Sequence, residues 1–152
     1  MAITQAMCTS FKVQLLKGQH NFNNGAHVFY LALYQETATL GAGTSVYTTA
    51  GEAAGGGSTN YVAGGKPLTN VTPSDGGAGT TAFTSFGTPL TWQSSTITAA
   101  GALIYNTTTN GGSSTLDSVI VLNFGGNKSS TSGDFSIVFP AVNANDAIIR
   151  IQ

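Results

Sequence analysis

Three apolar runs follow one another closely in the second half of the chain, at residues 97–105, 119–124 and 135–139. Short runs rich in Val, Ile and Phe that are bounded by Gly and Asn are typical of β-strands joined by turns. The Asn- and Gly-rich segments 110–113 and 125–127 therefore predict turns between the three strands. We expect these strands to form the centre of an antiparallel core.

The second of these runs is apolar at every position from 119 to 122, so it lacks the alternation of a half-exposed strand. A strand that is apolar on both faces has to be covered on both faces, by its own domain or by a partner chain. From this pattern we predict that the protein does not work as a monomer.

The start of the chain gives a mixed pattern. Residues 1–9 have no clear period and predict an extended arm, whereas residues 10–17 predict a short helix with Ser10 as its N-cap. Phe11, Val13 and Leu15 would also share one face of a strand, but Gly18 fits a helix end and favours the helix.

A long stretch rich in Gly, Ala and Thr, residues 36–65, contains no clear element, and its part from 51 to 65 predicts a Gly-rich loop. Such a segment is usually a functional loop or an interface arm. Because ordering Gly-rich chain is entropically costly, we expect the loop and the arm 1–9 to be mobile in the free protein and ordered only against a partner. The candidate interface residues are the larger apolar ones in or near these two segments: Ile3, Met7, Tyr47, Tyr61 and Val62.

Short strands are also predicted elsewhere along the chain. With the three central runs they make about eight strands and one short N-terminal helix in a single domain, residues 1–152. Regularly spaced short strands without strand–helix alternation predict an all-β fold, an antiparallel β-sandwich or jelly roll. The additional strands are expected at residues 27–34, 68–71, 82–86, 90–92 and 147–151.

Charge is scarce, because only 7% of the residues are charged and none lies between Asp75 and Asp117. The surface must therefore consist largely of hydroxyl, amide and Gly groups, and a net charge of −1 gives little repulsion between copies. Five scattered Lys and Arg residues argue against nucleic acid as a partner. No apolar run has the length of a membrane span, and the first residues lack a signal-peptide pattern, so we expect synthesis in a cytoplasm and no membrane partner.

The residues give no catalytic set, and we expect no enzyme activity, cofactor or metal. Cys8 is the only cysteine, and no Ser, His and carboxylate occur in a recognisable nucleophile pattern. His20 and His27 could meet as metal ligands, but a pair without a third ligand is a weak signal. Trp92 could stack on a sugar, although a core position is favoured for a single Trp within a strand.

Four segments of the chain resemble segments of a known group of proteins. They are MCTSFK at residues 7–12, FYLALY at 29–34, GALIYN at 101–106 and NDAIIRI at 145–151. Together they are similar to small virion structural proteins of tailed bacteriophages, in particular the capsid decoration, or cement, proteins. The similarity extends over the chain except for residues 51–65, and its motifs are packing patterns, so no functional residue is carried over.

The resemblance implies a β-sandwich or jelly roll that binds the outside of the phage head and stabilises it. The implied partners are the major capsid protein and copies of the chain itself, as a homodimer or homotrimer. The expected location is the virion, after synthesis in the cytoplasm of the host bacterium. Two alternatives stay open: a tail, collar or fibre-associated subunit, and a carbohydrate-binding β-sandwich module.

Overall fold

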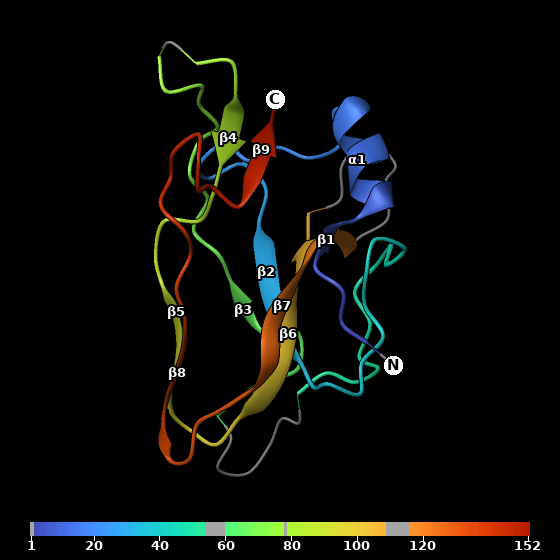
Figure 1. Cartoon of the computed structure of the whole chain (residues 1–152), viewed down its shortest axis with the longest axis vertical. Coiled ribbons are helices and arrows are strands. Elements are labelled where there is room, and N and C mark those ends of the chain that lie inside the picture. Colours follow the sequence, from blue (N-terminus) through green and yellow to red (C-terminus); the bar gives the residue numbers. More distant parts are fainter. Residues whose placement is uncertain (1, 54–59, 78, 109–115) are drawn as a thin grey trace.

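The computed structural model describes residues 2–53, 60–77, 79–108 and 116–152, and Figure 1 shows the chain. The described residues contain one helix and nine strands, so the prediction of an all-β fold with one short N-terminal helix is confirmed. No helix among these residues is long and apolar enough to cross a membrane. In chain order the elements are β1 (Ala6–Met7), α1 (Thr9–Leu16), β2 (Phe29–Tyr34), β3 (Lys66–Pro67), β4 (Ala82–Thr84), β5 (Leu90–Ser95), β6 (Thr98–Asn106), β7 (Asp117–Ser129), β8 (Gly133–Ile137) and β9 (Ile149–Ile151).

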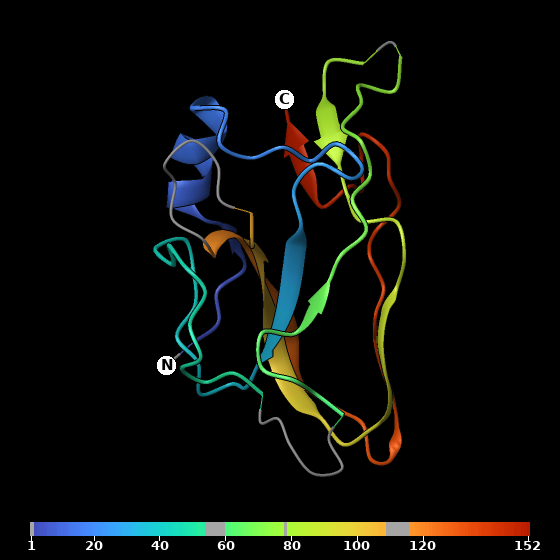
Figure 2. The ribbon, with the colours of Figure 1, turned by 180° about the vertical axis from the view of Figure 1, so that it is seen from behind.

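The last six strands pair as a nested antiparallel set, which follows from the three central apolar runs. β6 pairs with β7, with Leu103 opposite Val121. The strands on either side of this pair, β5 and β8, pair with each other, and the outermost two, β4 and β9, pair in turn. This part of the chain is therefore one long hairpin whose two arms are paired in three stages, as the ribbons in Figures 1 and 2 show.

The largest sheet has five strands in the order β1-β7-β6-β2-β3. β2 pairs with β6 along its whole length, so the first long strand of the sequence joins the central hairpin. The β5–β8 and β4–β9 pairs remain separate two-stranded sheets. Nested pairing is compatible with a sandwich or jelly roll, but the described strands do not form a second continuous sheet, so that finer part of the fold stays a prediction.

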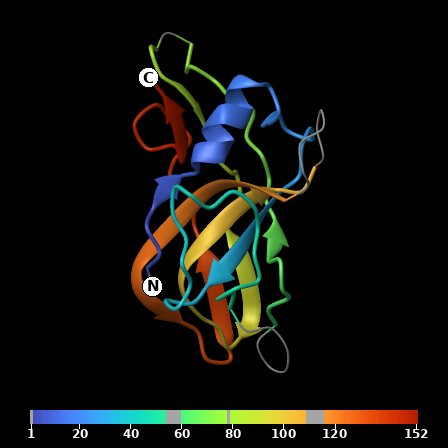
Figure 3. The same cartoon turned by 90° about the vertical axis from the view of Figure 1, so that its right-hand side faces the viewer.

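The core is centred on β6, where every residue except Thr98 is buried. Gly101 leaves no room for a side chain within β6, because a Cβ atom there would lie 2.4 Å from the Leu122 carbonyl oxygen and 2.9 Å from the Ile3 side chain. β7 is buried from Asp117 to Val121, and α1 packs against it from the same chain, as Figure 3 shows. The apolar faces of the run 119–122 are thus largely covered within the chain, and that run is no evidence for a partner.

The N-terminal segment is docked on the rest of the domain and does not extend away from it, whereas its mobility in the free protein stays a prediction. Ile3 and Cys8 are buried, and β1 pairs with β7 at Val121 and Ile120. The Thr4 amide donates a hydrogen bond of 2.8 Å to the Leu40 carbonyl oxygen, which docks the segment on the following part of the chain. The sequence suggested an arm because residues 1–9 show no regular apolar period, although Ile3 and Cys8 are buried in the structure.

The helix is confirmed, but its details differ from the prediction. Its N-cap is Cys8 rather than Ser10, and no side chain caps the first turn. Phe11 is the one buried residue of the helix, whereas Leu16 is 90% exposed. Gly18 has a φ of +71°, so the residue that predicted the helix end does adopt the left-handed conformation that favours Gly.

A bulge replaces the turn that was predicted at residues 125–127. β7 continues through this segment, and the pairing passes from Gly101 opposite Asn123 to Ala99 opposite Lys128. Gly125 and Gly126 have positive φ values, which lets four residues of β7 loop out opposite one residue of β6. The same Gly signal marks either a turn or a bulge, and only the partner strand decides between them. The other predicted turn, 110–113, lies outside the described residues.

Candidate functional site

All five tyrosines of the chain gather around Glu52, beside β2 and β6. Both oxygens of the Glu52 carboxylate are used: Oε1 accepts hydrogen bonds of 2.6 Å from the Tyr61 hydroxyl and from the Gly64 amide, and Oε2 accepts one from the Tyr47 hydroxyl. The remaining tyrosines complete the cluster through ring contacts and a hydrogen bond. The Tyr105 ring stacks on Tyr47 with 4.7 Å between centroids and contacts Tyr30, and the Tyr34 hydroxyl donates to the Thr48 carbonyl oxygen.

The tyrosine cluster holds residues 47–53 and 60–64 against the sheet. Burial, followed by the hydrogen bond to Glu52, raises the pKa of Tyr61 and Tyr47 well above the usual range, so both hydroxyls remain neutral donors. The Tyr61 hydroxyl also accepts a hydrogen bond of 2.9 Å from the Leu33 amide of β2. These contacts anchor the described ends of the predicted Gly-rich loop, whereas residues 54–59 lie outside the described part.

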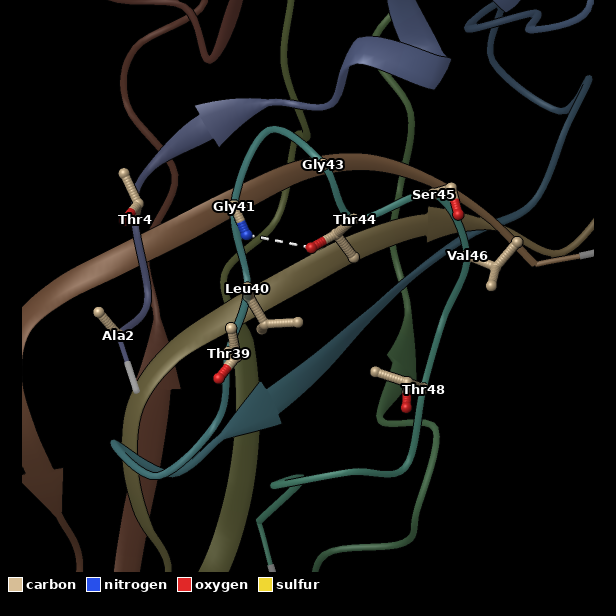
Figure 4. A pocket seen from close by; sticks show the side chains of 10 residues that line it. All are labelled: Ala2, Thr4, Thr39, Leu40, Gly41, Gly43, Thr44, Ser45, Val46 and Thr48. Atoms are coloured by element: carbon tan, nitrogen blue, oxygen red, sulfur yellow. Dashed lines mark hydrogen bonds between the residues drawn. The ribbon is translucent and has the colours of Figure 1, made fainter.

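An open hollow of about 570 Å³ lies where the N-terminal segment meets residues 39–48, as Figure 4 shows. We call it the hydroxyl hollow, because threonine and serine side chains dominate its lining. The two segments are joined by backbone hydrogen bonds, among them one of 2.8 Å from the Thr9 amide to the Ala42 carbonyl oxygen. The lining residues are Ala2, Thr4, Thr39, Leu40, Gly41, Gly43, Thr44, Ser45, Val46 and Thr48.

The lining of the hydroxyl hollow is uncharged and combines hydroxyl groups with apolar surface. None of its lining residues has an ionisable side chain, so the hollow offers no group for proton transfer. The Thr44 hydroxyl accepts a hydrogen bond of 3.0 Å from the Gly41 amide, which fixes the turn between them (Figure 4). Val46 is 44% exposed and adds an apolar contact point. This combination suits a broad, uncharged and partly apolar partner surface.

The structure separates the five residues predicted as an interface. Ile3 is 8% exposed and Tyr61 is 2% exposed, so the structure places both side chains inside the chain and not on the surface where they were predicted. Met7 and Tyr47 are partly buried within the chain, the latter inside the tyrosine cluster. Val62 is 74% exposed and remains accessible. Burial of Ile3 and Tyr61 follows from their size, because an otherwise small-residue segment needs them as anchors.

The sequence located the segments of the hydroxyl hollow but not its residues. Both the N-terminal segment and the region 36–65 were expected at an interface, and the hollow forms where they meet. Its own residues were missed because Thr, Ser and Gly carry no chemical signature. Their only signal is the low complexity of the run TLGAGTSVYT at residues 39–48.

Cys8 and Trp92 have structural roles. Burial raises the pKa of the Cys8 thiol to about 11, while the charge of Lys12 lowers it by less, so the reactive thiolate is disfavoured. Trp92 is 1% exposed and packs against Phe135 and Tyr61. The expected core position of Trp92 is therefore confirmed, and the carbohydrate-binding alternative loses its aromatic platform.

His20 and His27 do come together, but around an amide rather than a metal. The Asn106 Nδ2 atom lies 3.1 Å from the Nδ1 atom of His20 and 2.9 Å from that of His27. Because an amide NH₂ group only donates, both Nδ1 atoms must accept, and both rings are neutral with the proton on Nε2. His20 Nε2 then donates to the Gln14 side-chain oxygen at 3.0 Å. Among the described residues, no group of three His, Cys, Asp or Glu is placed to hold a metal ion.

Acidification is expected to destabilise the protein through His20. Burial lowers the pKa of His20 to about 4, although the nearby Asp117 opposes this and His27 adds to it. Since the unfolded chain binds the proton first, the stability contributed by neutral His20 is complete above pH 6.5 and is lost as the pH falls towards 4. Lowering the pKa from 6.5 to about 4 corresponds to a contribution of about 3 kcal/mol to the free energy of unfolding. Burial also lowers the pKa of His27, which acts in the same direction.

Urea unfolding at pH 7 and pH 4.5 measures this effect. The variant His20→Gln should be less stable than the parent at pH 7. Its free energy of unfolding should, however, differ much less between pH 7 and pH 4.5 than that of the parent. An unchanged difference in the variant would show that other groups cause the acid sensitivity.

Comparison of the chain with family models, curated proteins and solved structures finds no match. The function is therefore argued from the geometry of the described residues and from the resemblance given above.

Proposed function

We propose that the chain is a non-enzymatic structural subunit of a virion, a decoration subunit that binds the outer surface of a tailed-phage head and stabilises it. The observation that carries the proposal is the hydroxyl hollow, which is open, has a volume of about 570 Å³ and is lined by no ionisable side chain. It is made by two extended segments that are fixed to each other and to the sheet. Such a surface is suited to contact with another protein rather than to turnover of a small substrate.

The chemistry of the hydroxyl hollow indicates what kind of partner surface it would take. Hydroxyl and backbone groups can exchange hydrogen bonds with polar side chains and with exposed backbone, and Val46 adds a small apolar contact. The scarcity of charge makes such contacts insensitive to salt, which favours a protein surface over nucleic acid. The resemblance to tailed-phage virion proteins adds the class of assembly and points to the major capsid protein as the partner.

Stabilisation would follow from mass action. A subunit that binds the assembled shell and not its separated parts shifts the equilibrium towards the shell in proportion to its occupancy. A subunit with rigid attachment segments gains from this arrangement, because little conformational entropy is lost when it binds. The docked N-terminal segment of the structure meets this requirement.

A bulky charge in the hydroxyl hollow is expected to weaken attachment without unfolding the subunit. Ser45 lines the hollow and is exposed, so Ser45→Arg should weaken binding to heads assembled without this chain by about 10-fold or more. The matched control is Thr80→Arg, since Thr80 is also exposed and lies on another loop, outside the hollow. Co-sedimentation of each purified variant with the heads measures the binding. Equal binding by the two variants would contradict a role for the hollow in attachment.

A further inference from the structure

A small pocket lies between α1 and the paired strands β4 and β9, which stand at the same end of the molecule (Figures 1 and 2). Its volume is about 110 Å³, and it shares no lining residue with the hydroxyl hollow. We call it the apolar pocket, because eight of its nine lining residues have apolar side chains and the ninth is Thr84. The apolar pocket is therefore a separate site with a different chemistry.

The floor of the apolar pocket consists of buried side chains, whereas its rim is open to solvent. Phe11 of α1, Phe22, and Phe83 and Ile149 of the β4–β9 pair line it, and each is at most 8% exposed. Ile151, the last residue of β9, also lines the pocket but is 53% exposed. A molecule could thus enter past the rim and reach an apolar floor.

The walls of the apolar pocket are held in place by contacts outside it. Phe22 stacks on Phe29 of β2 with 4.4 Å between ring centroids, and α1 packs against β7. On the opposite side the Phe83 amide donates a hydrogen bond of 2.8 Å to the Ser74 carbonyl oxygen, and β4 pairs with β9. Because each wall is fixed by a different part of the fold, the pocket is preformed, as small-molecule sites usually are.

Water is poorly accommodated in the apolar pocket. Among the described residues that line it, none is ionisable, and the Thr84 hydroxyl already donates to the Val71 carbonyl oxygen. An ordered water needs two to four polar partners, which this lining does not supply. Replacing weakly held water by an apolar group gains affinity.

The volume of the apolar pocket sets the size of a ligand. Sites for drug-sized molecules have about 300–1,000 Å³, whereas an apolar cavity of about 150 Å³ lined by Leu, Ile and Phe binds benzene. With about 110 Å³ and an open rim, the apolar pocket has room for one six-membered ring or one branched alkyl group of similar size.

We propose that the apolar pocket binds a small, neutral, apolar molecule of about the size of a benzene ring, taken up from solution. The phenylalanine rings at its floor provide faces and edges for contact with such a ring. A free molecule is favoured over a peptide segment, because the polar backbone groups of a peptide would find no partner at this apolar lining. The inference concerns a different surface from the hydroxyl hollow and does not depend on binding to a phage head.

Titration with benzene tests the site directly. In ¹H–¹⁵N spectra of the full-length protein, benzene should shift the amide signals of Phe11, Phe83 and Ile149, with a dissociation constant of about 5 mM or below. Benzoate is the matched probe, because it carries the same ring with a charge that the pocket cannot receive, and it should leave these signals unchanged. Absence of shifts with benzene at these amides would overturn the proposal, and so would equal binding of benzoate.

Filling the apolar pocket tests its location. Ala82 lines the pocket but is exposed, so Ala82→Leu adds three carbon atoms at the rim without disturbing the buried floor. It should raise the dissociation constant for benzene by about 10-fold or more, because the added side chain occupies the space of the ligand. The matched control is Ala63→Leu, since Ala63 is also exposed but does not line the pocket, and it should leave the affinity unchanged.

Equal affinities of the two variants for benzene would overturn the assignment of the site. Both measurements use the free protein without phage heads, so a failure here is distinct from a failure of the proposed attachment.

Discussion

Gly65→Ala is expected to lower the free energy of unfolding by at least about 4 kcal/mol. Gly65 has a φ of +76°, and a Cβ atom there would lie 1.8 Å from the Leu31 carbonyl oxygen and 2.8 Å from the Ala32 Cα atom. Both are atoms of the buried strand β2, so they cannot move aside without disturbing its pairing with β6. The variant should therefore separate β3 and the tyrosine cluster from the sheet.

Gly25→Ala is the matched control for this substitution. Gly25 has nearly the same φ, +79°, but a Cβ atom there would meet nothing within 4 Å. Gly25→Ala should therefore lower the free energy of unfolding only by the backbone strain, about 1–2 kcal/mol. Urea unfolding followed by Trp92 fluorescence measures both variants. Equal losses for the two would mean that the close approach of Gly65 to β2 is not what makes Gly necessary there.

Glu52→Ala is the second substitution with a large expected effect. It removes the acceptor of the Tyr61 hydroxyl, the Tyr47 hydroxyl and the Gly64 amide at once. Donors that lose their partner in a buried site cost about 1–3 kcal/mol each, and the partly buried Tyr47 is expected to cost less than the buried Tyr61. We expect a total loss of about 3–5 kcal/mol.

Glu36→Ala separates this effect from the mere loss of a carboxylate. Glu36 is the other glutamate of the chain; it is exposed and accepts one hydrogen bond, from the Asn127 side chain. Its replacement should change the free energy of unfolding by no more than about 0.5 kcal/mol. Thermal and urea unfolding of the two variants under the same conditions make the comparison. Similar stabilities would show that the tyrosine cluster does not depend on its carboxylate.

The strands were the most predictable part of the fold. Runs such as residues 97–105 are rich in β-branched and apolar side chains and are long enough to fill a buried strand, so local pattern and final position agree. The N-cap of α1 and the bulge in β7 were not predictable in the same way. Each depends on a neighbouring element, because a Gly-Gly-Asn segment is a turn or a bulge according to whether the strand beside it continues.

The candidate sites were less predictable than the fold. Sequence pattern identified the N-terminal segment and residues 36–65 as unusual, but it took Ile3 and Tyr61 for contact residues when their size makes them anchors. The tyrosine cluster could not be foreseen, since its members come from β2, β6 and the segment between β2 and β3. Contacts between distant segments leave little trace in a single sequence.

Cryo-electron microscopy of the virion is the most direct test of the proposed decoration role. We expect density that fits this chain on the outer surface of the head, with the hydroxyl hollow facing the major capsid protein. Density for the chain in the tail, with none on the head, would contradict the proposed function.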